Sequence, residues 1–336
     1  MTSNIKKIPT IYDVAQLSGV SISTISRVLN SPEKVNPETR TQVLKAIDEL
    51  AFVPRAEARA RALRSTGRIG VITPFFTAPS FVQRMRGIAA ALSKEKQELV
   101  VYTVESSSQL KNYLASLPLT GNLDGLIIMS LPVMEEDARR LLEHKLPTVL
   151  IEYPFPSLSS VEIDDAAGGR LAAEYLIGKG HRRIAFLGDT NLPEYAIHPV
   201  SLRLAGFREA LKQAGLQLPD EFVRLAPFSQ EQTRRAASEL LRTQQPPTAV
   251  FAATDFQAFG VLKAARQLGV NIPAQLAVLG FDDLDWAEYA DLTTVRQHLD
   301  ESGRLAIELL LSRIADPFRP PQHIHLPLTI VERATV

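Results

Sequence analysis

The segment TIYDVAQLSGVSISTISRVLN, residues 10–30, decides the fold of the amino-terminal part of the chain. Thr10 is a suitable N-cap for a first helix, because Asp13 stands three residues later as its capping-box partner. Gly19 permits a tight corner, and Ser21 is a suitable N-cap for a second helix. Two short helices joined by a sharp turn are therefore predicted.

The second of these helices is predicted to be amphipathic. Successive residues of a helix are about 100° apart, which places three branched residues on one side: Ile25, Val28 and Leu29. Four polar residues fall on the other side: Ser23, Ser26, Arg27 and Asn30. Ile22 lies at the border between the two stripes.

A third helix is predicted in NPETRTQVLKAIDELAF, residues 36–52, with Asn36 as N-cap and Pro37 at the first helical position. Its apolar face is formed by Val43, Leu44, Ile47 and Leu50. Three short helices around so small a core leave the polar side of the second helix free. Small polar groups and one arginine suit base edges and phosphates, and the alternative is a stripe that merely faces water.

Charge is divided unevenly along the 336 residues. Residues 1–66 hold ten Lys/Arg and six Asp/Glu, a net charge of +4, whereas the remainder hold 27 and 31, a net charge of −4. A basic end on an acidic body suggests that the end meets a polyanion. The absence of cysteine excludes disulfides and thiolate catalysis. No signal peptide or membrane-length apolar run is found, so a cytoplasmic protein without a membrane partner is expected.

From residue 68 onward, short apolar runs alternate with segments of helical period. Runs such as IGVIT (69–73), TAVFAAT (248–254) and LAVLGFDD (276–283) suit strands buried on both faces. Their alternation predicts α/β architecture with doubly wound parallel sheets, and two such series predict two similar lobes. Ligands of these sheets bind beyond the carboxyl ends of the strands, so a cleft between the lobes is the expected site.

The body carries few signs of catalysis. It has no phosphate-binding glycine loop and no nucleophile elbow, and no cofactor is expected. In HIH, residues 323–325, both imidazoles would share one face of a strand, where a metal site competes with a plain surface strand. The aspartate pairs at 164–165 and 282–283 are either paired acids or helix caps. The body is interpreted as a binding module and not as an enzyme.

The chain resembles the LacI family of bacterial transcription regulators. Residues 10–30, followed by VNPETRTQVLKAIDELAFVP, look like the family's DNA-binding headpiece. Family motifs of the body follow in order: GHRRIAFLGD (180–189), RLAGFREAL (203–211), TAVFAATDFQAFGVLKA (248–264), LAVLGFDD (276–283) and LTTVRQ (292–297). The corner at Gly19 is thereby identified as that of a helix-turn-helix.

The resemblance implies a domain division. It places a helix-turn-helix headpiece over residues 1–54, a hinge helix and linker over 55–67, and an effector-binding and dimerisation body over 68–336. The body is expected to have the two-lobed fold of periplasmic binding proteins. Its N-lobe spans about residues 68–162 and 297–324, and its C-lobe about 163–296 and 325–336.

By resemblance, the helix that begins at Ser21 enters the major groove of DNA. Ile22 and Ser23 occupy positions that vary with operator sequence, and Arg27 contacts a base or the backbone. Ile22 offers an apolar contact, for example to a thymine methyl group, and its alternative is core packing. The positions that contact phosphates or cap helices are Thr10, Tyr12, Ser21, Thr24, Asn30 and Asn36, and Ser26 shares the polar side.

The hinge segment VPRAEARARALRSTGRIG, residues 53–70, departs from the family pattern. In the family, a leucine about seven residues beyond the proline wedges into the minor groove, but that place holds Arg61 here. If the active turn starts two residues later, Leu63 joins an alanine stripe and Arg59 is among the arginines left for phosphates. Leu63→Ala is then expected to lower operator affinity by about 1–3 kcal/mol and to reduce bending, with Arg61→Ala costing less. The alternative is a solvated linker.

The body resembles sugar-binding lobes, which hold polyols with carboxylates, amides, arginines and an aromatic ring. Arg203 matches the effector-binding arginine and Asp282 the acid that accepts sugar hydroxyls; their alternatives are a surface charge and a helix cap. Phe81 is a candidate for stacking, with core packing as its alternative. Gln297 ends LTTVRQ, at a crossover expected to line the cleft.

Three departures leave the identity of the effector open. Thr254, which precedes Asp255 in the effector motif, stands where an asparagine is usual. Glu152 stands where an aspartate is usual. PFFTAPSF, residues 74–81, lacks the acidic and amide residues common in that loop.

The sequence thus predicts a homodimeric, cytoplasmic regulator, with repression the expected mode, whose lobes close on a small carbohydrate-like effector. Its partners would be a palindromic double-stranded DNA operator, the effector and a second copy of the chain. The effector could act as inducer or corepressor. No leucine heptads follow LPLTIVER, residues 326–333, so a coiled-coil tetramer is not expected.

Two other kinds of protein compete with this interpretation. A solute-binding protein without gene control would leave residues 1–66 without a purpose. A sugar-processing enzyme would have to use Asp282 and Glu152, although no pairing of a base with a nucleophile is evident.

Overall fold

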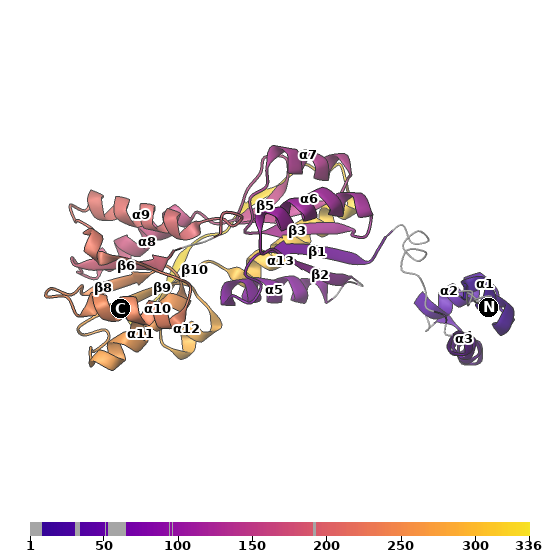
Figure 1. The fold of residues 1–336 in the computed structure, drawn as a ribbon, viewed down its shortest axis with the longest axis horizontal. Helices are drawn as coiled ribbons and strands as arrows, with labels where there is room; N and C mark the ends of the chain where they lie inside the picture. Colours follow the sequence, from indigo (N-terminus) through magenta and orange to yellow (C-terminus); the bar gives the residue numbers. More distant parts are fainter. Residues whose placement is uncertain are drawn as a thin grey trace, which may run out of the picture. The chain divides into compact units, whose positions relative to one another are not determined.

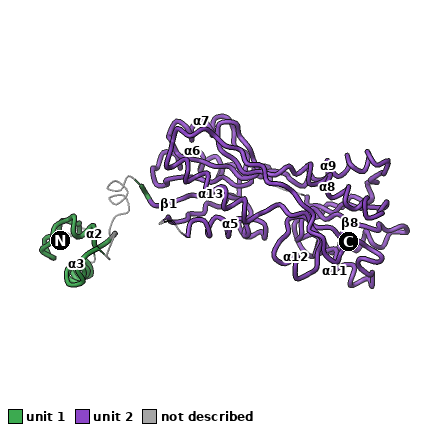
Figure 2. Tube along the Cα trace, turned by 180° about the vertical axis from the view of Figure 1, so that it is seen from behind, with its two compact units in different colours: residues 1–66 green, residues 67–336 purple. Residues whose placement is uncertain are grey.

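The computed structural model describes residues 9–30, 34–50, 52, 65–93, 95, 97–190 and 193–336. The chain divides into two compact units, residues 1–66 and 67–336, which Figure 2 draws in green and purple. Each unit has a hydrophobic core of its own. The predicted hinge residues, with Arg59, Arg61 and Leu63, lie outside the described part of the chain.

In its described residues, the first unit contains α1 (Ile11–Ser18), α2 (Ile22–Asn30) and α3 (Pro37–Leu50). The backbone N–H and the hydroxyl of Thr10 donate to the carboxylate of Asp13, at 2.7 and 2.6 Å. Gly19 has φ 66°, the left-handed conformation that ends α1. The backbones of α2 and α3 donate to Ser21 Oγ (3.2 Å) and Asn36 Oδ1 (2.8 Å). These predicted helix boundaries are confirmed.

The core of the first unit is small, and its buried members are Val14, Ile25, Val28, Val43 and Ala46. The predicted apolar face of α3 is wrong at Leu44, which is 40% exposed. Because α3 packs only against two short helices, its buried stripe is narrow. That stripe runs through Val43, Ala46, Ile47 and Leu50, spaced i, i+3, i+4 and i+7.

The second unit contains two six-stranded sheets. The first has the order β11-β5-β4-β3-β1-β2 and all its strands are parallel. Its strands are β1 (Arg68–Thr73), β2 (Glu98–Thr103), β3 (Gly125–Met129), β4 (Thr148–Ile151), β5 (Ser159–Glu162) and β11 (His323–His325).

The second sheet has the order β12-β10-β9-β8-β6-β7, and only β12 runs antiparallel to its neighbour. Its strands are β6 (Ile184–Asp189), β7 (Val223–Ala226), β8 (Ala249–Ala252), β9 (Ala277–Asp282), β10 (Thr293–Arg296) and β12 (Thr329–Val331). Strand β5 is not predicted by the hydrophobic pattern, because its residues SSVE contain no apolar run.

Helices cover both faces of each sheet, as Figure 1 shows. In the first lobe, α5 (Pro79–Leu92) and α13 (Leu299–Ala315) cover one face, and α6 (Ser107–Thr120) and α7 (Glu135–Glu143) cover the other. In the second lobe, α8 (Asp165–Gly178) and α9 (Pro199–Gln213) lie opposite α10 (Gln230–Leu241) and α11 (Asp255–Leu268). A short helix, α12 (Asp285–Tyr289), and a 3₁₀ turn, η2 (Asp220–Phe222), complete the second lobe. The α/β fold with doubly wound sheets is confirmed.

The chain passes between the lobes three times, after β5, after β10 and after β11. The predicted lobe boundary at 324/325 falls inside β11, whose last residue, His325, pairs with Glu162 in the first sheet. Three segments of the chain therefore connect the two lobes.

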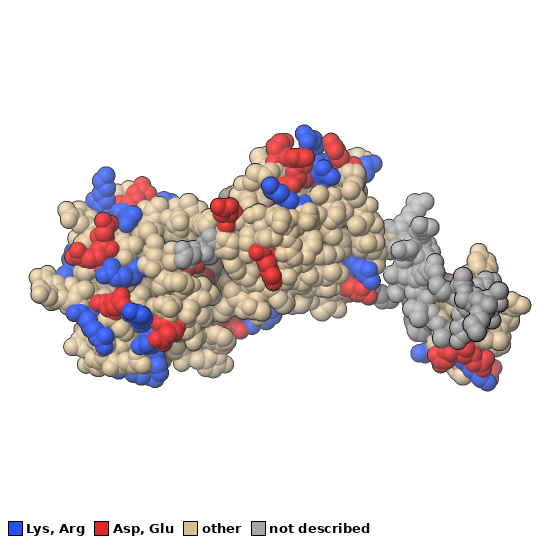
Figure 3. All heavy atoms as spheres, in the orientation of Figure 1, with Lys and Arg blue, Asp and Glu red and all other residues tan. Residues whose placement is uncertain are grey.

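Among the described residues, no helix is both long and apolar enough to cross a membrane. On the face in Figure 3, and among the residues described there, basic and acidic side chains are intermixed over α7 and over the second lobe. This part of the body therefore offers no broad basic surface to a polyanion.

Candidate functional sites

The polar side of α2 is exposed, as its predicted role requires. Ile25 and Val28 are buried on the opposite side, whereas Ser23 and Arg27 face solvent. Ile22 is 37% exposed, so the core-packing alternative for this side chain is wrong. The carboxamide of Gln42 on α3 donates to the last carbonyl of α1 (2.8 Å), which fixes the corner that presents this surface.

The hydroxyl groups at the start of α2 are linked to one another. Ser21 Oγ lies 2.7 Å from Ser23 Oγ and 2.9 Å from Thr24 Oγ1. Thr10, Tyr12 and Asn36 are exposed, Tyr12 by 70%, while Thr24 and Ser26 are partly buried. Asn30 is the last residue of α2. Their contacts with DNA stay predictions, as do those of Arg59 and Leu63.

A cleft of about 460 Å³ opens between the two lobes of the second unit. Five of its polar residues stand at or just beyond the ends of strands: Ser130 after β3, Glu152 after β4, Asp189 and Asp282 at the ends of β6 and β9, and Thr254 two positions after β8. This is the position predicted for a ligand of parallel sheets. Four cleft residues at or just beyond the ends of strands have positive φ: Phe75 (44°), Ser130 (56°), Glu152 (71°) and Asp282 (126°). Strained backbone of this kind is concentrated at ligand sites.

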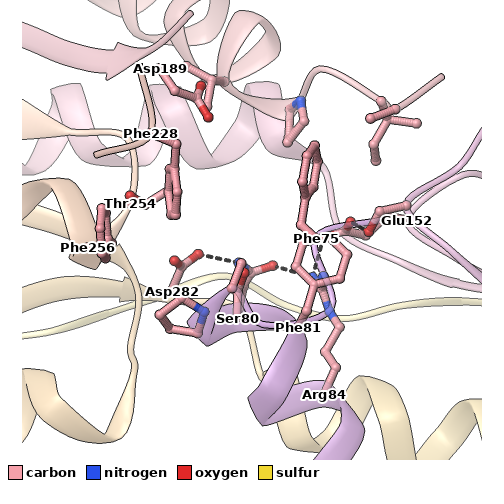
Figure 4. A pocket seen from close by; sticks show the side chains of 18 of the residues that line it. Phe75, Ser80, Phe81, Arg84, Glu152, Asp189, Phe228, Thr254, Phe256 and Asp282 are labelled. Atoms are coloured by element: carbon pink, nitrogen blue, oxygen red, sulfur yellow. Dashed lines mark hydrogen bonds and ion pairs between the residues drawn. The ribbon is translucent and has the colours of Figure 1, made fainter. Parts of the chain in front are cut away.

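A hydrogen-bonded chain of side chains forms the floor of the cleft and crosses from one lobe to the other. Ser130 donates to Glu152, and Arg84 on α5 forms an ion pair with Glu152. Arg84 Nη2 also donates to Gln297 Oε1 at 2.9 Å, and Gln297 Nε2 donates to Asp282 Oδ1 at 2.5 Å. Figure 4 shows this chain of bonds at the base of the pocket. Gln297 therefore links the two lobes at the floor of the cleft.

Arg203 is held as rigidly as Arg84, but in the second lobe. Its Nε donates to Asp165 Oδ1 (2.8 Å), its Nη1 donates to the carbonyl of Ala253 (2.6 Å), and its guanidinium lies 3.6 Å from the centre of the Phe281 ring. Asp282 is 3.9 Å away. Arg203 is 3% exposed, which rules out the surface-charge alternative.

Glycines bring the helices that carry both arginines against their neighbours. A Cβ atom on Gly87 of α5 would lie 2.0 Å from the carbonyl oxygen of Asp300 on α13. A Cβ atom on Gly206 of α9 would lie 1.9 Å from the carbonyl oxygen of Ala166 on α8. Glycine is needed for this close approach, which places Arg84 beside Gln297 and Arg203 beside Asp165.

Burial dominates the ionisation of the carboxyl groups in the cleft. It raises the pKa of Asp282 to about 7, although Arg203 and the hydrogen bond from Gln297 favour the charged form. Burial also raises the pKa of Asp165 against the opposing effect of Arg203. The same effect raises the pKa of Asp189.

The helix-cap alternative for Asp282 is wrong, whereas Asp164 does cap α8, accepting from the Ala167 N–H at 2.8 Å.

The structure gives the other predicted residues different positions. Phe81, Thr254 and Glu152 line the cleft, and Phe81 makes an edge contact with Phe75 at 5.9 Å between ring centres. Asp255 does not line it, so its assignment to the effector site is wrong. Asp255 is fully buried and accepts bonds from the Leu284 N–H (2.7 Å) and the Thr294 hydroxyl (2.5 Å). It supports the loop behind Asp282, because each of its carboxylate oxygens accepts a hydrogen bond from within the protein.

Sequence reasoning missed several cleft residues, namely Arg84, Asp189, Phe75, Phe228, Phe256 and Trp286. Phe228 and Phe256 stack with 4.3 Å between ring centres. The residue after each predicted strand was a usable signal for Asp189, which ends IAFLGD. Arg84 gave no such signal, because its partners lie far along the chain.

Among the described residues, no group of three histidine, aspartate or glutamate side chains is placed to hold a metal ion. In the HIH strand, His323 Nδ1 lies 2.8 Å from the Ser160 hydroxyl, and His325 Nε2 lies 3.7 Å from Glu162. These contacts support the surface-strand interpretation.

The chain combines a helical unit that has an exposed polar helix face with a two-lobed unit that has a cleft between its lobes, an arrangement typical of DNA-binding proteins that respond to a small molecule. A family model described as bacterial regulatory proteins, lacI family, matches residues 10–55, and a periplasmic binding protein-like domain matches residues 173–336. The ribose operon repressor of Escherichia coli (strain K12) is 34% identical over 333 residues, covering 97% of this chain and 99% of that one. This chain belongs to the lacI family of bacterial regulatory proteins, as its sequence motifs predicted.

Solved structures agree with this assignment. A lac repressor dimer bound to operator and the anti-inducer ONPF matches with a TM-score of 0.77 and 29% identity, covering 98% of this chain and 99% of that chain. A complex of the transcriptional regulator CelR with cellobiose matches with a TM-score of 0.68 and 31% identity, covering 98% of this chain and 100% of that chain. The chain is a DNA-binding transcriptional regulator.

Proposed function

We propose that this regulator is a homodimeric repressor that binds a palindromic operator through α2 and responds to a small carbohydrate-like ligand in the cleft. The names of its relatives, a ribose operon repressor and a regulator in complex with cellobiose, support a sugar. The related dimer on operator DNA supports the assembly. A protein with this task acts in the bacterial cytoplasm, where the DNA is. The domain division proposed from the sequence fits the unit boundary at 66/67.

The observation that carries the proposal is the floor in which Gln297 joins Arg84 of one lobe to Asp282 of the other. These groups offer the mixture of acceptors and donors that sugar hydroxyl groups require. A ligand bound to both ends of this chain of bonds has contacts with both lobes, and so it favours one arrangement of the lobes over others. Such a difference in affinity is what couples a ligand site to operator binding.

The walls of the cleft suit the apolar faces of a sugar ring. Phe75 and Phe81 stand on the first lobe, and Phe228, Phe256 and Trp286 on the second. A volume of about 460 Å³ lies in the ordinary range for small-molecule pockets. We propose that the cleft residues predicted from the sequence contact the effector, because all of them line this cleft: Phe81, Glu152, Thr254, Arg203, Asp282 and Gln297.

We assign the cleft to binding without turnover. Ser130 is the hydroxyl that a nucleophilic mechanism would use, but its carboxylate partner Glu152 is already in an ion pair with Arg84. A carboxylate so held is a poor general base. Chromatography of the ligand after prolonged incubation with the protein should return it unchanged.

The experiment that tests the function uses the full chain. An operator is selected from a random DNA library, and its binding is followed by fluorescence anisotropy with D-ribose, cellobiose and other neutral sugars. We expect at least one sugar to change operator affinity by about fivefold or more, which is the usual range of allosteric coupling. The proposal would be contradicted if the protein selected no DNA sequence, or if none of the sugars changed its affinity for the operator.

A further inference from the structure

Asp189, the last residue of β6, carries a carboxyl oxygen without a partner. Its Oδ1 is buried and has no hydrogen-bond partner among the described residues. Burial raises the pKa of this carboxyl group, while the charge of Arg203, a hydrogen bond from the backbone of Asp189 itself and the charge of His198 act in the opposite direction. A buried polar atom without a partner is costly, and native proteins rarely keep one. Asp189 lines the cleft, so a ligand can supply the missing donor.

The other charged groups of the cleft already have partners. Arg84 is paired with Glu152, Arg203 with Asp165, and Asp282 accepts from Gln297. Two arginines thus stand against four carboxyl groups, the fourth being Asp189, so the site gains negative charge, to a limit of −2, as the carboxyl groups whose pKa burial raises lose their protons. Charges in an enclosed site are poorly screened, so a ligand with its own negative charge is repelled there.

The position of Asp189 makes it a contact for one end of the ligand. Figure 4 shows its carboxyl group across the pocket from Asp282, with Phe75 and Phe228 at the sides of the hollow. A ring between these aromatic side chains would present one edge to the floor around Asp282 and the opposite edge to Asp189. The two carboxyl groups therefore address different substituents of the same ligand.

We infer that Asp189 is a specificity-determining residue that accepts hydrogen bonds from an O–H or N–H donor of the ligand, and that the cleft selects neutral or amine-bearing sugars against sugar phosphates and sugar acids. The inference rests on the proposed sugar-binding function. It adds to that function the chemical class of the ligand, and it names Asp189 as the residue that discriminates against negatively charged sugars.

The test compares the full-length protein with Asp189→Asn, which keeps the shape of the side chain and removes its charge. Asp220→Asn is the matched control, because the Asp220 side chain is fully exposed in the same lobe. Calorimetry measures the binding of the best neutral sugar from the operator screen, its amino-sugar analogue and its phosphate ester. We expect Asp189→Asn to weaken the neutral or the amino sugar about tenfold or more, since a charge-assisted bond is lost, and to reduce the discrimination against the phosphate.

The amino sugar and the neutral sugar distinguish the two sources of the donor. A larger loss for the amino sugar identifies an ammonium group at Asp189, and equal losses identify a hydroxyl group. The thermal stability of the unliganded variant is a second readout, independent of the ligand. Because the wild-type carboxyl group has no partner at Oδ1, Asp189→Asn should be at least as stable as the wild type.

Four results would overturn the inference. Unchanged sugar affinity in Asp189→Asn would remove Asp189 from the site while leaving the proposed function intact. Preferential binding of the phosphate ester by the wild type would refute the charge argument. A clear loss of unliganded stability in the variant would show that the carboxyl group serves the fold. If no sugar binds at all, the proposed ligand class fails first, and the inference fails with it.

Discussion

The exposed side of α2 and the floor of the cleft hold their functional side chains in different ways. On α2, Ser23 and Arg27 project from a helix whose opposite side is anchored by Ile25. In the cleft, Arg203 and Asp282 are themselves buried, and each is bound by other side chains. Surface residues of the first kind can change without harm to the fold. Residues of the second kind serve recognition and stability at once, because a buried charge must keep its partners.

Removal of Arg203 is the strongest test of this difference. Arg203→Ala leaves Asp165 and Asp282 without their cation, so we expect the body to lose about 3–5 kcal/mol of unfolding free energy. Ligand affinity should fall tenfold or more, while operator affinity without ligand stays within a few-fold. Urea denaturation and calorimetry measure these effects. Arg208→Ala, on the exposed side of the same helix, is the control and should change stability by about 0–1 kcal/mol. An equal loss of unfolding free energy in the two variants would contradict the buried ion pairs of Arg203.

The pair Ile22 and Ile25 tests the same difference within one helix. Ile25 is fully buried in the small core, so Ile25→Ala should cost about 2–5 kcal/mol and abolish operator binding while ligand binding is kept. Ile22 is 37% exposed, so Ile22→Ala should leave stability within about 0.5 kcal/mol. It should still alter the preference among operator sequences by about 1–3 kcal/mol. Circular dichroism measures stability, and fluorescence anisotropy measures operator binding. A clear loss of stability in Ile22→Ala would show that Ile22 packs in the core.

Asp282 adds a dependence on pH to this comparison. Its pKa is about 7 in the folded protein, against about 3.9 for an unfolded aspartate. Between these values the folded state holds a proton that the unfolded state has lost. The stabilising contribution of the group is therefore complete below about pH 4 and is lost as the pH rises through 7.

The side chain introduced by Asp282→Asn does not titrate. The free energy of unfolding of the variant, relative to that of the wild type, should therefore rise as the pH increases from about 4 to about 8. At about 1.4 kcal/mol for each pKa unit, the gain is roughly 2–4 kcal/mol between pH 4 and 8. Urea denaturation at pH 4.5, 6 and 8 measures it, and above pH 8 the difference should be constant. A difference that does not change with pH would show that Asp282 ionises normally.

The smallest expected effect concerns Arg86, an exposed residue that nevertheless joins the lobes. It bonds to Asp300 of the first lobe at 2.7 Å and to Asp285 of the second at 3.0 Å, and about half of its side chain is exposed. Exposed ion pairs contribute about 0–1 kcal/mol, so Arg86→Gln should change ligand affinity roughly twofold to fivefold at low salt and not at high salt.

Arg304→Gln is the control for Arg86, since the partners of Arg304, Glu301 and Glu308, lie on its own helix. Calorimetry measures the ligand affinity of both variants at low and at high ionic strength, and only Arg86→Gln should show a change that depends on salt. An equal response to both substitutions would mean that the contact between lobes has no influence on ligand binding.

Local patterns in the sequence determined the helices of the headpiece and the alternation of strands and helices in the body. Caps such as Thr10 with Asp13 and the turn at Gly19 depend on residues a few positions apart, so they can be identified without tertiary structure. The rule that ligands bind at the carboxyl ends of parallel strands located the cleft, and family motifs located Arg203, Asp282 and Gln297 within it. The sequence was misleading at Leu44, where helical period does not show how few neighbours the helix has.

Tertiary structure alone decided which polar residues face the ligand. Arg84 meets Gln297 across 213 positions of sequence, because Gly87 allows α5 to approach α13. Asp255 and Asp282 both stand near the ends of strands and look alike in sequence, yet one is directed into the protein and the other into the cleft. The unpartnered oxygen of Asp189 is likewise a property of its surroundings. Sequence patterns record the identity and period of residues, whereas partners and burial arise only when distant segments pack together.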